Sequence, residues 1–304
     1  MNQSRRWWMT GLAIGATVLG AYSFFSRPVV GAEGASGISP GIIDAHIHTD
    51  FDGKPDAASG IVNSAEQLFK EMDKHGVVGA VSMTGQDHRR GFDASLKRKQ
   101  VKFCAGVAMK VDVAGIERGL KAGDYSCIKI YLGYVYRYAY DAAYRPLYRL
   151  ARKYKVPVVF HTGDTYSVKG KLKYADPLTV DEVAVDFPDV NFVIAHCGNP
   201  WIQSAAEVAY KNPNVYLDGS ALLIGDLSKS PKDKVDAYVV QPLAWVFGYL
   251  ENPSKLMYGT DWALTDMGSY IEAFKRAIPK EHWQAVFHDN AAKVFGFSPP
   301  PTAK

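Results

Sequence analysis

From Gly41 onward, short apolar runs alternate with segments in which apolar residues recur every three or four positions. The first pattern is typical of buried strands and the second of amphipathic helices. Strands are predicted near 42–48, 77–83, 102–107, 127–131, 156–161, 191–196, 215–217 and 256–258. Helices are predicted near 64–74, 113–122, 142–154, 178–186, 202–211, 235–247 and 271–278, with a short one at 93–99. This alternation predicts an α/β fold, a single (β/α)8 TIM-type barrel.

Four of the predicted strands end in residues that can bind a metal. The first run ends in His46 and His48, which lie two residues apart and therefore on one face of a strand. Three later strands run into His161, His196 and Asp261, each with a turn that contains glycine. The carboxyl ends of parallel strands meet at one rim of a barrel, where active sites lie. We therefore expect all five side chains to converge at that rim.

These motifs resemble the amidohydrolase superfamily of metal-dependent hydrolases, in the branch that includes aminocarboxymuconate-semialdehyde decarboxylase. The resemblance extends from about Gly41 to Phe297 and is specific for the fold and the metal site, but not for the substrate. The matching segments are DAHIH at 44–48, VVFHTG at 158–163, FVIAHCG at 192–198, YGTDW at 258–262 and NAAKVFG at 290–296.

The expected metal ligands are His46, His48, His161 and Asp261, around one divalent ion. Neutral imidazoles and a carboxylate suit zinc, and also iron or manganese. Asp261 would accept the proton of a metal-activated water and pass it to the leaving group, while His196 would stabilise the developing oxyanion. The resemblance implies the same roles at these positions. The chain is thus predicted to be a metal-dependent hydrolase of an ester, amide or lactone.

Two other functions fit the same residues. The first is a metal-dependent decarboxylase of an unsaturated or aromatic carboxylic acid, which the branch resemblance favours and export from the cytoplasm disfavours. The second is a non-catalytic binding barrel, against which the intact ligand set argues. The expected partner is a small-molecule substrate, and the family makes a homodimer plausible.

Four further residues are candidates for binding the substrate or bridging metals. Lys129 lies on the fourth predicted strand, where some superfamily members carry a carboxylated lysine that bridges two metals; the alternative is a buried amine paired with a carboxylate. Tyr131 and Arg137 belong to a tyrosine-rich loop that could line a pocket for an aromatic or acyl group. Arg89 could clamp a substrate carboxylate. The lysines of 169–173 suggest a solvated loop, and the segment 220–234 a lid.

The first 32 residues differ from the rest of the chain. A basic start at Arg5 and Arg6, an uncharged run over 7–25 and a small-residue site at 30–32 are typical of an export signal, and the paired arginines fit a twin-arginine signal. The alternative is an uncleaved membrane anchor formed by residues 7–25. We expect an exported protein, periplasmic or extracellular, with a linker at 33–40, the barrel at 41–297 and a loose tail at 298–304.

The net charge and the cysteine content limit the partners and the disulfide bonds that we expect. Residues 1–32 contain three arginines and no acid, so removing them lowers the net charge from +4 to about +1, and nucleic acid is not an expected partner. The three cysteines are odd in number and form no C-x-x-C pair, so no disulfide framework is expected. Cys104 and Cys127 are predicted to be buried strand residues, and Cys197 a core residue.

Overall fold

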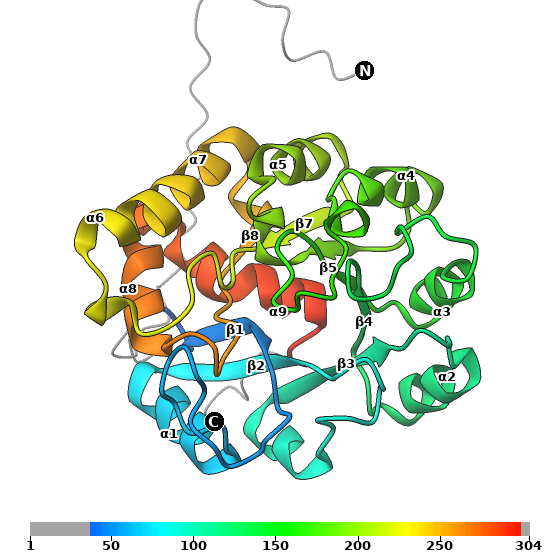
Figure 1. Ribbon diagram of the computed structural model, residues 1–304, viewed down its shortest axis with the longest axis horizontal. Helices are drawn as coiled ribbons and strands as arrows, with labels where there is room; N and C mark the ends of the chain where they lie inside the picture. Colours follow the sequence, from blue (N-terminus) through cyan, green and yellow to red (C-terminus); the bar gives the residue numbers. More distant parts are fainter. Residues whose placement is uncertain (1–36, 299–304) are drawn as a thin grey trace, which may run out of the picture. The chain divides into compact units, whose positions relative to one another are not determined.

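In the computed structural model, which describes residues 37–298, eight parallel strands follow one another in sequence order around a barrel (Figure 1). After β8 the chain meets β1: the Tyr258 carbonyl accepts from the Ala45 amide at 3.0 Å, and the Trp262 carbonyl from the His48 amide at 2.8 Å. These bonds nearly close the barrel, which confirms the predicted fold. The strands are β1 Ile42–Ile47, β2 Val77–Met83, β3 Val101–Val107, β4 Cys127–Tyr131, β5 Val158–His161, β6 Phe192–Ile194, β7 Val215–Asp218 and β8 Leu256–Met257.

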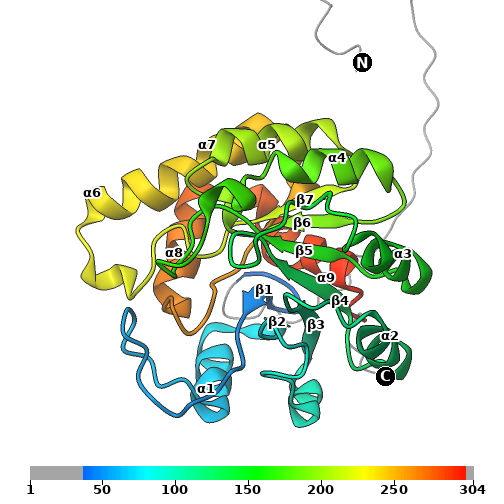
Figure 2. The same ribbon diagram turned by 45° about the vertical axis from the view of Figure 1, so that its right-hand side comes forward.

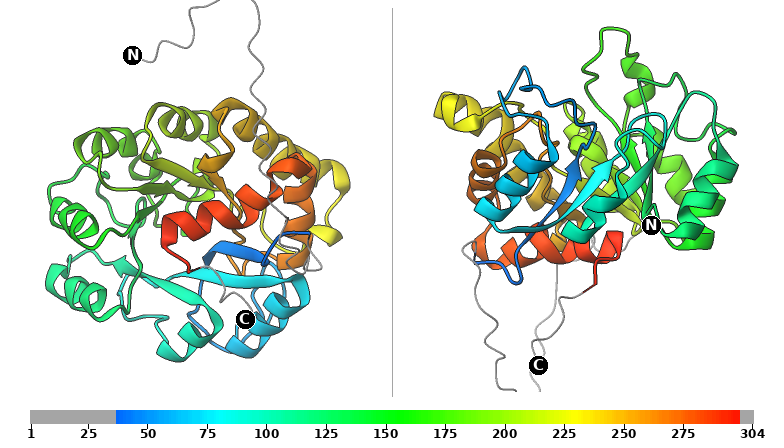
Figure 3. Two further views of the ribbon diagram at one scale, coloured as in Figure 1. Left: turned by 180° about the vertical axis from the view of Figure 1, so that it is seen from behind. Right: turned by 90° about the horizontal axis from the view of Figure 1, so that it is seen from below.

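The helices surround the strands on the outside of the barrel (Figure 2). The last one, α9, lies across the amino-terminal end of the barrel (Figure 3). All predicted helices are present, with ends that differ by a few residues. They are α1 Ala65–His75, α2 Val113–Ala122, α3 Arg145–Tyr154, α4 Thr179–Asp186, α5 Ile202–Lys211, α6 Lys232–Val235, α7 Gln241–Leu250, α8 Met267–Ala277 and α9 Asn290–Phe295, with short helices η2 Ala94–Lys99, η3 Leu172–Ala175 and η4 Ala195–Gly198 and a π-helical stretch η6 Asp236–Val240 between α6 and α7.

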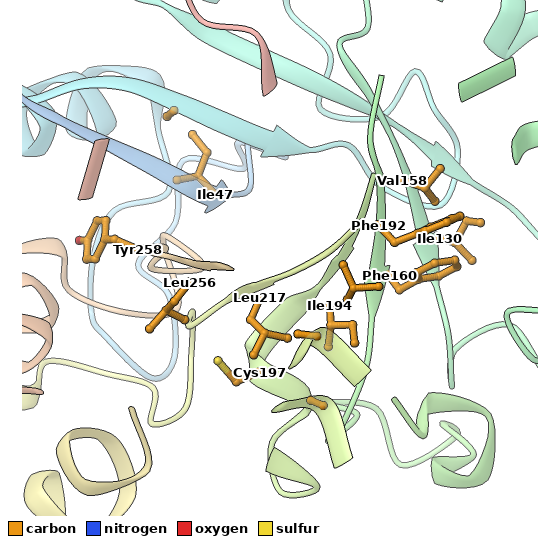
Figure 4. Packing of buried hydrophobic residues seen from close by; sticks show 14 of the residues in the cluster. Ile47, Ile130, Val158, Phe160, Phe192, Ile194, Cys197, Leu217, Leu256 and Tyr258 are labelled. Atoms are coloured by element: carbon orange, nitrogen blue, oxygen red, sulfur yellow. The ribbon is translucent and has the colours of Figure 1, made fainter. Parts of the chain in front are cut away.

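The core has two layers, divided by the wall of strands. The outer cluster packs alternate strand residues against the helices, as Figure 4 shows for residues such as Phe160, Phe192 and Leu217. The inner cluster joins residues of seven strands to the underside helix α9. Its members are Ile43, Ala45, Val81, Met83, Cys104, Cys127, Val159, Val193, Ala195, Met257, Ala291, Val294 and Phe295. This plug fills the amino-terminal part of the barrel and leaves its carboxyl end for polar side chains.

Strand β1 departs from strict alternation. The sequence predicts Asp44, His46 and His48 on one face and Ile43, Ala45 and Ile47 on the other, but Ala45 belongs to the inner cluster and Ile47 to the outer one. The pairing of β1 with β2 shifts register between Asp44 and Ile47, which turns His46 into the barrel. The prediction that Asp44 shares a face with His46 and His48 was therefore wrong: its carboxylate accepts hydrogen bonds from Thr260 and does not line the cavity that the two histidines line.

Cys104 and Cys127 form a disulfide, which corrects the expectation that none is present. Both are fully buried, as predicted. They are direct partners in the pairing of β3 with β4, with their Cα atoms 4.2 Å apart. Their separation of 23 residues carries no sign of this pairing, because only the strand register brings the two thiols together. Cys197 is free and buried in the outer cluster, which confirms its predicted role in the core.

No helix among residues 37–298 is long and apolar enough to cross a membrane. The predicted export signal or anchor at 1–32 and nearly all of the predicted tail lie outside the described residues, as does the first half of the predicted linker.

Candidate metal centre and substrate cavity

A cavity of about 450 Å³ opens at the carboxyl ends of the strands. All five residues expected at the rim line it: His46 and His48 from β1, His161 at the end of β5, His196 from η4 after β6, and Asp261 after β8. Each therefore reaches the cavity from a different strand end except for the His-x-His pair.

Three of these residues are close enough to share one cation. The ligand atoms of His46, His196 and Asp261 lie within 4.8 Å of one another, and all three residues are buried. His196 and Asp261 adopt left-handed backbone conformations, with φ of 59° and 62°. Such values are uncommon outside glycine and cluster at functional sites. They aim both side chains into the barrel immediately after a strand has ended, which alternation along a strand cannot predict.

The two histidines of this group are oriented from behind by Asp218 and Ser220. The Nδ1 of His46 lies 3.0 Å from an Asp218 carboxylate oxygen, and the Nδ1 of His196 lies 2.9 Å from the Ser220 hydroxyl. The other Asp218 oxygen accepts from the backbone amides of His196 and Ser220. Partners of this kind fix the tautomer and the ring direction of metal-binding histidines. The Nε2 of His46 is therefore left to face Asp261.

Sequence reasoning missed Asp218, although the signal was present. The segment 215–219 reads VYLDG, an apolar strand that ends in a possible ligand followed by glycine, as in the strands that were recognised. The structure gives Asp218 a supporting role because its carboxylate is fully buried behind His46.

Burial and neighbouring charges keep the group in the protonation states that metal binding requires. Burial, helped by Lys129, lowers the pKa of His46 to about 4, and burial also lowers the pKa of His196. Burial alone would raise the pKa of Asp261, but the imidazoles of His46 and His48 outweigh it, and the pKa falls well below its usual range. The site thus combines neutral imidazoles with an ionised carboxylate.

One atom shows that the group fits a cation. The Oδ1 of Asp261 is buried between His48 Nε2 at 3.1 Å and His46 Nε2 at 3.6 Å, and neither nitrogen is aligned to donate a hydrogen bond to it. A buried carboxylate oxygen without an aligned donor is costly in a folded protein. A divalent ion between this oxygen and the imidazole nitrogens would satisfy all of them.

His48 and His161, the other predicted ligands, flank this group. His48 is a third exposed; burial acts to lower its pKa, but contacts with Asp261 and Asp50 outweigh this and raise it to about 9. The Nε2 of His161 lies 2.8 Å from the Asp164 carbonyl oxygen, and its ring centroid lies 5.0 Å from that of His196. The division of roles among the four histidines stays a prediction.

Lys129 is buried beside the same group. Its Nζ lies 3.4 Å from the Nε2 of His46 and 5.4 Å from the centre of the Tyr131 ring. Burial lowers its pKa to about 8, although Asp218 and Asp261 act in the opposite direction. The amine thus occupies the place from which it could contact a substrate or, once carboxylated, a second metal.

The three remaining candidates differ in whether they line the cavity. Tyr131 lines the cavity, and its hydroxyl donates to the Thr84 carbonyl. Arg89 and Arg137 do not line it: Arg89 is exposed, and Arg137 donates to the Met109 carbonyl at 2.6 Å. Arg90, which sequence reasoning passed over, lines the cavity mouth and pairs with Asp50 at 3.0 Å. The shift of one residue reflects a loop whose side-chain directions the sequence does not specify.

Comparisons with known proteins agree with this architecture. The sequence profile described as amidohydrolase matches residues 43–297. No curated protein matches the chain. Similar solved structures include an uncharacterised TIM-barrel protein from Bordetella bronchiseptica (22% identity, TM-score 0.63, covering 84% of this chain and 98% of that one).

Two other similar structures have named activities. One is a probable 2-pyrone-4,6-dicarboxylic acid hydrolase from Acinetobacter baumannii with citric acid bound (18% identity, TM-score 0.63, covering 84% of this chain and 100% of that one). Another is a dihydroxybenzoic acid decarboxylase from Polaromonas sp. JS666 with manganese and the inhibitor 2-nitroresorcinol (15% identity, TM-score 0.61, covering 84% and 97%). At these identities the likeness shows the fold alone.

Proposed function

The chain belongs to the amidohydrolase family, and we propose that it is an exported metal-dependent hydrolase in which water adds to an ester, amide or lactone carbonyl. The observation that carries the proposal is the buried group of His46, His196 and Asp261 at the carboxyl end of the barrel, in which one Asp261 oxygen faces imidazole nitrogens without an aligned hydrogen-bond donor. A divalent ion held there would lower the pKa of a water molecule and polarise the carbonyl.

Each residue of the group has a task that its contacts support. His46 and Asp261 would hold the ion, with His196 and the flanking His48 and His161 completing its shell or facing the substrate. Asp261, ionised and buried, would accept the proton of the attacking water and pass it to the leaving group. Whichever imidazole stays free of the ion would donate to the developing oxyanion. The Asp218 carboxylate would keep the His46 ring in one orientation throughout the reaction.

The cavity walls suit a small substrate with a flat or unsaturated part. One wall is apolar and comes from the loops after β7 and β8; the opposite wall is aromatic, and Arg90 stands at the mouth. The apolar residues are Leu222, Leu223, Ile224 and Leu264, and the aromatic ones Tyr131, Tyr134 and Tyr166. The guanidinium of Arg90, held by Asp50, would favour an anionic group on the substrate.

The same aromatic wall favours a second candidate, a metal-dependent decarboxylase of an unsaturated or aromatic acid. The similar structures include both a hydrolase and a decarboxylase, so they do not separate the two reactions. Carbon dioxide release from a panel of aromatic acids, measured beside hydrolysis of esters, amides and lactones, would distinguish them.

We propose that the protein reaches an oxidising compartment, periplasmic or extracellular. The buried disulfide between Cys104 and Cys127 supports this, because such bonds persist mainly outside the reducing cytoplasm. The predicted signal at 1–32 points the same way. A homodimer and the cleavage of the signal remain predictions.

Metal content tests the proposal. We would measure metal per chain on protein that begins at residue 33, for the parent, for His46→Ala and for His282→Ala, a histidine outside the cavity. We expect about one equivalent of zinc, iron or manganese in the parent and the control and little in His46→Ala. Two equivalents would indicate a carboxylated, bridging Lys129. Full turnover by metal-free protein would contradict the proposal.

A further inference from the structure

We propose that the loop between β5 and α4 docks the catalytic rim on an anionic lipid surface. In Figure 3, right, this loop stands at the end of the barrel opposite α9. The inference is independent of the chemistry proposed for the cavity.

Exposed apolar side chains are concentrated at the rim. In the described part of the chain thirteen large apolar side chains are exposed, and nine of them lie in segments that connect a strand to the α-helix after it. The nine are Val62, Met109, Tyr136, Tyr140, Tyr166, Val168, Leu172, Leu178 and Ile224. Six of the nine come from the segments after β4 and β5, which contact each other, and exposed apolar side chains that lie together mark interaction surfaces.

The β5–α4 loop combines this apolar character with positive charge. The loop, residues 162–178, contains three lysines, at 169, 171 and 173, which lie together on the stretch between its two acids, Asp164 and Asp176. Val168 at its tip is fully exposed, Tyr166 is 67% exposed and Leu172 is 47% exposed. The segment was expected to be merely solvated, but alternating aliphatic and basic residues are what an anionic bilayer surface binds.

The loop is held in its exposed position by hydrogen bonds. The Tyr134 hydroxyl accepts from the Tyr166 amide at 2.8 Å, and the Tyr136 hydroxyl donates to the Lys169 carbonyl at 2.6 Å. The Lys171 amide donates to the Gly133 carbonyl at 2.9 Å. A side chain at Gly170 would collide with Thr165, so the tight approach requires glycine. The fold therefore presents Val168 to solvent on a fixed support.

The tyrosine-rich loop after β4 supplies that support. Only Tyr131 and Tyr134 of its first five tyrosines line the cavity. The others pack outside it: the rings of Tyr138 and Tyr140 are stacked with their centroids 5.2 Å apart, and Lys171 Nζ lies 4.2 Å from the centre of the Tyr136 ring. Tyrosine is enriched where a protein meets the headgroup level of a membrane.

A lipid surface explains the set of residues better than another polyanion. Nucleic acid bases and sugars would gain from the tyrosine rings and the lysines, but not from the aliphatic Val168 and Leu172. Acyl chains would take up the aliphatic tip, headgroup phosphates the lysines, and the interface the tyrosines. Because Tyr134 and Tyr166 also line the cavity, docking would place its mouth beside the lipid.

Vesicle sedimentation tests the proposal with the chain from residue 33, since the described residues, 37–298, contain the whole barrel. Vesicles of phosphatidylcholine alone are compared with vesicles that also contain phosphatidylglycerol. We expect binding to the anionic vesicles that weakens with salt. Neutralising all three lysines to glutamine should lower the partition coefficient on the order of 100-fold, and Val168→Asp by about tenfold.

Matched controls separate the loop from the general surface. Val185→Asp changes a valine that is 57% exposed on α4, and a triple change of Lys155, Lys234 and Lys280 to glutamine removes the same charge elsewhere. Circular dichroism melting checks that each variant folds. The proposal is overturned if the parent ignores anionic vesicles, if the controls lose as much binding as the loop variants, or if the loop residues bind single-stranded DNA instead. None of these outcomes bears on metal content or turnover.

Discussion

At the ends of β7, β8 and β1, polar side chains are buried and hydrogen-bonded to one another. In the loops after β4 and β5, by contrast, several tyrosines and lysines are exposed to solvent. Asp218 is fully buried and contacts His46 and the His196 backbone, while Lys169 is exposed and its only described contacts are through the backbone. Catalysis requires groups fixed within fractions of an ångström, and docking requires groups that a partner can reach. The proposed catalytic residues and the proposed docking residues thus lie on different sides of the same rim.

The buried side is also tied to the seam of the barrel. Thr260 donates to both Asp44 oxygens, through its amide at 3.0 Å and its hydroxyl at 2.6 Å. The next residue is Asp261, whose amide donates to the His46 carbonyl at 2.7 Å. The bonds that nearly close the barrel therefore also set the position of the proposed general base.

The largest effect is expected on the buried side, from Asp261→Asn. The amide keeps the shape of the side chain but loses the charge and the proton acceptor, so turnover should fall on the order of 10³-fold or more. Initial rates on the best substrate of the panel, with metal content measured in parallel, check this. Asp233→Asn, on the exposed face of α6, should change nothing. Retention of a tenth of the activity would remove Asp261 from its proposed role.

The next largest effect concerns stability on the other side of the barrel. Replacing Cys104 and Cys127 together by alanine opens a loop whose ends are 23 residues apart, and should lower the free energy of unfolding by about 3 kcal/mol. Denaturant melts of the double variant are compared with Cys197→Ala, which removes a buried sulfur without breaking a link. A reductant should destabilise the parent and leave the double variant unchanged. Equal stability of parent and double variant would contradict the prediction.

These comparisons also show how far the sequence could be read. The eight strands and their helices followed from apolar periodicity, because nearly all strand residues are buried. The five rim residues were found because each ends an apolar run. Asp218 also ends an apolar run, so the same pattern in the sequence indicates it as a residue of the rim.

Other features depend on three-dimensional geometry that no local pattern encodes. The left-handed backbone at His196 and Asp261 aims both side chains inward whatever the strand parity. The register of β3 with β4 creates the disulfide, and the register shift in β1 removes Asp44 from the cavity. In the loop after β2, the arginine at the cavity mouth is Arg90, the residue next to the predicted Arg89.

A smaller effect on the buried side is expected from Asp218→Asn. The amide fills the same space but no longer supplies a charged acceptor for the Nδ1 of His46, so metal affinity should weaken about 10- to 100-fold. Competition with a chromogenic chelator measures this. Ser220→Ala, which removes a neutral partner of His196, should cost less. If both variants bind metal as tightly as the parent does, Asp218 and Ser220 do not orient the metal-binding histidines.

The smallest effect tests whether the two sides are separable. Tyr136→Phe removes the hydroxyl that donates to the Lys169 carbonyl, a hydrogen bond worth about 1 kcal/mol, and keeps the ring that contacts Lys171. Turnover of a small soluble substrate should stay within about threefold of the parent, because no ligand loses a partner. Vesicle binding should weaken by a similar factor, because Val168 is held less firmly. Tyr154→Phe, whose hydroxyl contacts Glu117 away from the rim, is the control. If Tyr136→Phe instead lowers turnover as far as Asp218→Asn does, the tyrosine side takes part in the chemistry, and the division of the rim into a catalytic and a docking side is wrong.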